Sequence, residues 1–167
     1  STPTHNTMMS KPLMAREFLK YLFARRGLMT MVPVEAMAYL RSRPDLEFPD
    51  IKLSFGTMMM DQRSKTRTRT PGVVVYANVA KPKSRGEIRL RSASAIDKPV
   101  VDHRLLGDPD DVAALVSGVK QVQDLFAMPA LARFTTGRIW PDPLPASDAE
   151  WEQRLRNECG IGYHPVA

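Results

Sequence analysis

The chain has 167 residues, of which 43% are hydrophobic and 25% are charged, with a formal net charge of +6. This composition is typical of one globular domain, and no apolar run approaches the roughly 20 residues that span a bilayer. The sequence therefore predicts no transmembrane segment. Cys159 is the single cysteine, and His5, His103 and His164 lack the spacing of metal ligands, so we expect neither an internal disulfide nor a metal site.

The first predicted element is a helix over residues 10–27. Ser10 is a candidate N-cap, Pro12 lies in the first turn and Gly27 is a stop signal. Its apolar face comprises Met14, Phe18 and Leu22. Before this helix the chain begins with Ser1 and shows no basic-then-apolar signal segment. The natural N-terminus therefore need not be present. A cytoplasmic location is favoured, although no sequence signal identifies the compartment.

Strands are predicted next. Residues 34–41 alternate between two faces with the period of two expected of a half-buried strand, and residues 50–55 repeat the pattern. Two further runs, 72–80 and 86–92, flank the segment KPKSRG at 81–86. Proline, serine and glycine suit a connection between neighbouring strands.

Two helices with clear start signals follow. Asp108 and Pro109 begin the longer one, and Ser147 with Glu150 forms a capping box for the second, which ends at Gly160. Residues at helical spacing are Val112, Leu115, Val116, Val119, Val122 and Phe126 in the first, and Trp151, Leu155 and Cys159 in the second. The sequence thus predicts an α+β fold, a mainly antiparallel sheet flanked by helices, with residues 1–167 as a single domain.

The basic segment RSKTRTRT at 63–70 raises nucleic-acid binding as an alternative function. Its arginines and lysine alternate with small polar residues, without interleaved aromatic residues, just before the turn at Pro71 and Gly72. This pattern favours a solvated loop.

Motifs for nucleotide binding or nucleophilic catalysis are absent from the sequence. There is no GxGxxG between a strand and a helix, no GxxxxGK[ST], and no Ser-His-Asp order. His164 is the one candidate base, although a lone histidine is more often structural than catalytic.

Four stretches in order resemble the glucose-methanol-choline (GMC) oxidoreductases, flavoenzymes that oxidise alcohols. They are GLMTMVPVEAMAYLRSRPDLEFPDIKLSF, KPKSRGEIRLRSASAIDKPVVDHRLLGDPDD, GVKQVQDLFAMPAL and GIGYHPVA. The most specific matches are Ser84-Arg85-Gly86 with the strand IRLRS, and Tyr163-His164-Pro165-Val166, which looks like the start of the family's HPVGT segment. VEAMAYLRSR and DKPVVD resemble choline-oxidising members most.

The resemblance implies a role for His164. It would accept the hydroxyl proton of an alcohol while a hydride leaves the carbon for FAD. Tyr163 and Pro165 would supply geometry. The electron acceptor would be oxygen or a quinone-type carrier. The second active-site residue, a histidine or asparagine in the family, lies downstream of the matched stretches.

Glu35 is a second candidate by the same resemblance. In choline-oxidising members a glutamate on the matching strand faces the cationic head of the substrate, and Glu35 would take that role. A solvent-facing strand residue or a structural ion pair are the alternatives. Met58, Met59 and Met60 could line an adaptable pocket, but filling of core and loop is the favoured interpretation.

The resemblance also implies an incomplete chain. The GxGxxG region that supplies most of the FAD site in the family is not in the sequence, and Ala167 stands where the family continues with glycine. We therefore expect a substrate-binding domain without the FAD-binding domain. We expect this chain alone neither to bind FAD nor to be active. The alternatives are a basic nucleic-acid-binding module and a non-catalytic structural domain descended from the enzyme.

Overall fold

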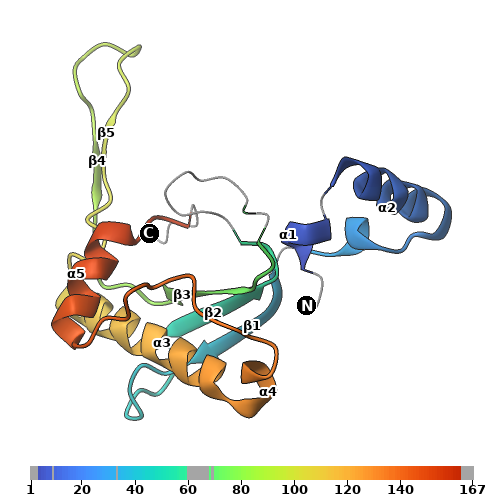
Figure 1. Cartoon of the computed structure of the whole chain (residues 1–167). Coiled ribbons are helices and arrows are strands. Elements are labelled where there is room, and N and C mark those ends of the chain that lie inside the picture. The colour runs from blue at the N-terminus through green and yellow to red at the C-terminus, as the bar shows by residue number, and fades with distance from the viewer. Residues whose placement is uncertain (1–3, 9, 33, 60–67, 69, 163–167) are drawn as a thin grey trace.

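The computed structural model describes residues 4–8, 10–32, 34–59, 68 and 70–162 (Figure 1). The helices are α1 (His5–Met8), α2 (Lys11–Ala24), the 3-10 helix η1 (Leu28–Thr30), α3 (Pro109–Ala127), α4 (Pro129–Ala132) and α5 (Asp148–Glu158). The strands are β1 (Val34–Leu40), β2 (Ile51–Gly56), β3 (Val74–Val79), β4 (Glu87–Arg89) and β5 (Val100–Asp102).

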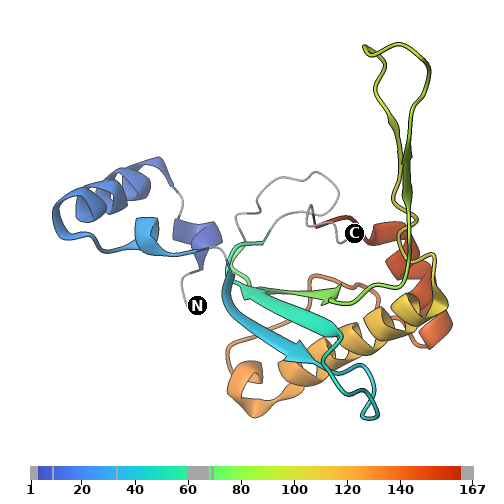
Figure 2. The same ribbon diagram turned by 180° about the vertical axis from the view of Figure 1, so that it is seen from behind.

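The central sheet is antiparallel in the order β1-β2-β3, and α3 covers one of its faces. Ile51 and Leu53 of β2 point toward α3 and pack around Ala114, as expected for alternate residues of a strand with one buried face. Gly118 lets the helix approach closely, because a Cβ there would lie 3.1 Å from Cγ2 of Ile51. The α2 and η1 segment extends to one side of the sheet in both views (Figures 1 and 2).

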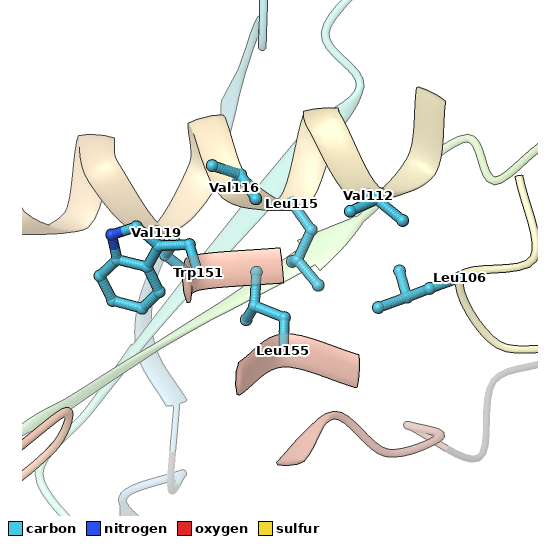
Figure 3. Close-up of a cluster of buried hydrophobic side chains, with 7 residues drawn as sticks. All are labelled: Leu106, Val112, Leu115, Val116, Val119, Trp151 and Leu155. Atoms are coloured by element: carbon cyan, nitrogen blue, oxygen red, sulfur yellow. The ribbon is translucent and has the colours of Figure 1, made fainter. Parts of the chain in front are cut away.

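The largest apolar cluster joins α3 to α5 (Figure 3). Its members are Leu106, Val112, Leu115, Val116, Val119, Trp151 and Leu155, all buried. Cys159 packs against this cluster, and burial raises the pKa of its thiol. The core is therefore formed by residues that lie at the predicted helical spacing in α3 and α5.

All three predicted N-cap residues precede their helices, and two of them make a side-chain cap hydrogen bond. Asp108 accepts a hydrogen bond from the amide of Asp110 at 2.8 Å, and Ser147 accepts one from the amide of Glu150 at 3.2 Å. Ser10 precedes α2 without a side-chain cap. The predicted apolar face of α2 is largely exposed among the described residues, with Phe18 at 51%.

The prediction that the runs at 72–80 and 86–92 are neighbouring strands is wrong. β3 pairs with β2, whereas β4 pairs with β5 in a separate two-stranded sheet, with Glu87 opposite Asp102. Figure 2 shows this hairpin standing away from the rest of the molecule as an arm. The connecting segment is hydrogen-bonded to the start of α3 through Asp111. The fold class, an α+β fold with antiparallel sheets and flanking helices, is confirmed.

Candidate active site

The face of the sheet opposite α3 is open among the described residues. Met37 on β1 lies opposite Ser54 on β2, which in turn lies opposite Tyr76 on β3, so the three side chains share this face. Tyr39 lies two residues from Met37 and is 57% exposed. Lys52 lies opposite Tyr39 on the same face, and Ser54, between Met37 and Tyr76, is buried.

Glu35 lies on β1 where the pairing of β1 and β2 is irregular between Val34 and Ala36. Such a bulge re-aims a side chain. Oε1 of Glu35 accepts a hydrogen bond from the Thr57 hydroxyl at 2.5 Å and lies 3.6 Å from Nδ1 of His5. Glu35 thus belongs to a local polar cluster while its side chain stays 32% exposed. Its role toward a substrate remains a prediction.

Sequence reasoning missed the part played by α1. Asn6 is buried, donates to the carbonyls of Met59 at 2.8 Å and Thr68 at 2.7 Å, and accepts from the amide of Met59 at 2.7 Å. Asn6 therefore fixes α1 beside the sheet. The sequence signal was only a pair of polar residues, His5 and Asn6, in a four-residue element too short to show periodicity.

His164 lies outside the described residues, as do Tyr163 and Pro165. The described chain continues past α5 as far as Gly162. The assignment of His164 as a base therefore remains a prediction.

Two other predicted features lie partly outside the described residues. Of the basic segment 63–70, only Thr68 and Thr70 are described. Nucleic-acid binding therefore stays an untested alternative. Of the three methionines, Met59 is buried and Met58 is half-buried, whereas Met60 is not described.

Within the described residues, no group of three or more His, Cys, Asp or Glu side chains is placed to hold a metal ion. In the same part, none of the helices has the length and apolar character needed to cross a bilayer.

The Ser84-Arg85-Gly86 motif is held by a buried carboxylate at the start of α3. Asp111 is 3% exposed and accepts hydrogen bonds from the amides of Lys83 and Ser84, both at 2.8 Å, and from the Ser84 hydroxyl. Gly86 is needed for close approach, since a Cβ there would lie 2.1 Å from the carbonyl oxygen of Asp102. The motif therefore connects the central sheet to the β4–β5 arm.

This arrangement predicts a pH dependence of stability. Burial raises the pKa of Asp111, but the hydrogen bonds from Lys83 and Ser84 outweigh it, so this pKa lies below its ordinary value. A lowered pKa in the folded state stabilises the protein above the ordinary carboxyl pKa, and this contribution is lost as pH falls through the folded-state value. We expect Asp111→Asn to reduce the loss of stability on acidification. Urea unfolding between neutral and acid pH measures this, and an unchanged pH slope in the variant would contradict it.

The N-termini of α3 and α5 do not suit the pyrophosphate of FAD. A dinucleotide is held by a glycine-rich turn at a helix N-terminus, where free amides and the positive end of the dipole meet the phosphates. The first turn of α3 carries Asp110 and Asp111, and that of α5 carries Asp148 and Glu150. These carboxylates repel phosphate. The cofactor site expected for the family is therefore not formed at these helix ends.

Comparison with known proteins identifies the family. The sequence model of the GMC oxidoreductases matches residues 82–167, more than half of the chain. The chain belongs to the GMC oxidoreductase family. The matched residues include the Ser84-Arg85-Gly86 motif and His164. The match confirms the resemblance found in the sequence.

Two curated GMC-type relatives illustrate the similarity. The alcohol dehydrogenase [acceptor] of Pseudomonas putida is 30% identical over 146 residues, which cover 87% of this chain and 26% of that protein. The choline oxidase of Arthrobacter globiformis is 32% identical over 126 residues, covering 72% of this chain and 23% of that protein. The chain spans about a quarter of the length of these relatives.

A solved structure matches the fold. A crystal structure of formate oxidase superposes with a TM-score of 0.83 at 19% identity, covering 98% of this chain and 33% of that one. At this identity the similarity concerns the fold of the GMC-type domain alone.

Proposed function

We propose that residues 1–167 form the substrate-binding domain of a longer FAD-dependent GMC oxidoreductase that oxidises an alcohol, with choline-like compounds as the substrate class. The family match across residues 82–167 carries this proposal. Relatives named choline oxidase, oxygen-dependent choline dehydrogenase and alcohol dehydrogenase support it. Oxygen or a quinone-type carrier would take the electrons.

His164 is the proposed proton acceptor. Histidine suits this task because its ordinary pKa lies near neutrality, so the neutral imidazole is available to take a hydroxyl proton. FAD, when bound in the complete enzyme, supplies the acceptor for the hydride. Pro165 would supply geometry, because proline fixes its own φ next to the histidine.

Glu35 is the proposed partner of a cationic substrate group. The carboxylate is partly exposed on the strand that also carries Met37 and Tyr39. A carboxylate attracts an alkylammonium ion, and aromatic groups offer it contact area.

The proposal predicts that the purified 167-residue chain binds no FAD tightly. The chain lacks the phosphate-binding turn, and acidic residues occupy the first turns of α3 and α5. Flavin absorbance after purification measures this, with the complete protein as the positive control. Stoichiometric flavin on the chain would contradict the assignment of residues 1–167 as a domain without the cofactor site.

A further inference from the structure

The β4–β5 arm carries an exposed apolar face. Ile88 on β4 lies directly opposite Val101 on β5, so the two side chains share one face of the hairpin. Leu90 follows Ile88 by two residues, the spacing that keeps side chains on one side of an extended chain. Ile88 is 74% exposed, Leu90 84% and Val101 47%. These three residues form the apolar face of the arm, and most of their surface meets solvent.

The other face of the arm is charged, and its charges have partners within the arm. Glu87 lies directly opposite Asp102, and Arg104 lies 3.7 Å from the carboxylate of Glu87 and 3.2 Å from that of Asp102. Hydrogen bonds from the amide and the guanidinium of Arg104 hold the pKa of Asp102 below its ordinary value. Arg89 lies 3.8 Å from Glu87. This face is therefore suited to water.

Both ends of the arm are fixed to the rest of the domain. On the entering side, the amide and hydroxyl of Ser84 donate to Asp111. On the leaving side, Leu106 is buried in the cluster of α3 and α5, and its carbonyl accepts from Nη1 of Arg156 at 2.7 Å. Arg104 and Leu106 have positive φ values of 43° and 54°, which persist only where the surroundings enforce them. The domain therefore sets the direction of the arm.

The arm needs a further surface to cover it. A two-stranded hairpin by itself is marginally stable in water, and β4 and β5 pair over only three residues each. Figures 1 and 2 show the arm projecting beyond the other described elements, so no described helix or strand lies along its length. Covering the apolar face would bury three large side chains and would stabilise the pairing of the strands.

The size of the apolar face indicates what covers it. A stable interface between separate molecules engages roughly 20–30 residues on each side, far more than this face offers. A segment of the same polypeptide needs no such area, because the chain already holds it nearby. This chain covers 26% of the alcohol dehydrogenase [acceptor] and 23% of the choline oxidase described above, so most of each relative lies outside the matched part.

We propose that the apolar face of the arm docks against the part of the complete polypeptide that lies outside residues 1–167, which holds FAD in the proposed function. This inference rests on the proposed function, because it requires the longer flavoenzyme. The surface that meets Ile88, Leu90 and Val101 is apolar, and the charged face of the arm stays in water. The arm is thus an intramolecular interface between the two parts of the enzyme.

Photo-cross-linking in the complete protein tests the proposal. The photoreactive residue p-benzoylphenylalanine replaces Ile88 on the apolar face or, as a matched control, Arg89 on the charged face. After irradiation, mass spectrometry identifies the linked peptides. We expect position 88 to form an intramolecular cross-link to a peptide outside residues 1–167, and position 89 to form little of it, because the two side chains point to opposite faces of the hairpin.

Three results would overturn the proposal. A covalent dimer on a denaturing gel would show that a second copy covers the face. A cross-link confined to residues 1–167, or equal yields at positions 88 and 89, would show that the rest of the polypeptide does not dock there. Anaerobic reduction by alcohol is measured separately. A protein that cross-links as expected but oxidises no alcohol contradicts the proposed function and leaves the interface intact.

Truncation of neighbouring side chains gives a second readout. We expect Leu90→Ala to lower the melting temperature of the complete protein by roughly 5 °C, because a side chain buried at the interface is lost. Arg89→Ala should lower it by about 1 °C or less, since a surface ion pair contributes little. Equal changes in the two variants would contradict the docking of the apolar face. The cross-linking experiment does not depend on whether Leu90→Ala folds.

Discussion

His164→Ala in the complete protein should leave FAD bound but slow the reduction of the flavin by alcohol by about 10²- to 10⁴-fold, the usual loss when a positioned general base is removed. The reason is that the hydroxyl proton then has no acceptor as the hydride leaves. Rapid mixing of enzyme with alcohol under anaerobic conditions measures this step without interference from reoxidation.

Two controls distinguish loss of a base from loss of the fold. The variant must retain the wild-type flavin spectrum and melting temperature. His103→Ala serves as a matched control, because His103 lies just after β5 and is exposed. A folded, flavin-loaded His164→Ala protein that is reduced within about threefold of the wild-type rate would show that His164 is structural.

Asp111→Ala should lower the free energy of unfolding by about 3 to 5 kcal/mol, because two backbone amides and a hydroxyl lose their buried acceptor together. The amides belong to Lys83 and Ser84, which connect the central sheet to the β4–β5 arm. For a domain of this size the loss corresponds to a fall in melting temperature of roughly 10 °C.

The neighbouring residue provides the control for this prediction. Asp110 is exposed and pairs with the Lys83 side chain at the surface. Surface ion pairs contribute little, so Asp110→Ala should change the melting temperature by a small fraction of the effect of Asp111→Ala. Differential scanning calorimetry of both variants measures the two changes in melting temperature. Equal effects would show that the buried hydrogen bonds of Asp111 do not stabilise the connection.

Elements with local signals could be predicted from the sequence. α3 follows from Asp108 as N-cap, from Pro109 and from a long apolar stripe, all of which act within a few residues. β1 was predicted from alternation, and the strand is present, but its burial does not alternate as expected, because residues 35–39 are all exposed. In α3 the same residues determine both local structure and burial, and the sequence records them directly.

The arm and α1 could not be predicted in this way. β4 and β5 have three residues each, and the segment before them is held by Asp111, which lies 27 positions along the chain from Ser84. The cluster of His5 and Thr57 joins residues 52 positions apart. Contacts of this kind depend on how elements pack, and neither periodicity nor capping signals encode them.

The candidate site was predicted only through the family resemblance. Glu35 alternates with its neighbours like any strand residue, and nothing in the spacing distinguishes a ligand-binding carboxylate from a solvated one. The partners of Glu35 became visible once the fold brought α1 and the end of β2 together.

The most direct test of the proposed function is anaerobic addition of choline to the complete, flavin-loaded protein. We predict that the absorbance of oxidised flavin is lost as choline is oxidised. The loss should be slower with the neutral isostere of choline, 3,3-dimethylbutan-1-ol. A flavin-loaded protein whose absorbance stays unchanged with choline, the isostere and simple primary alcohols would contradict the assignment of this chain to an alcohol-oxidising enzyme.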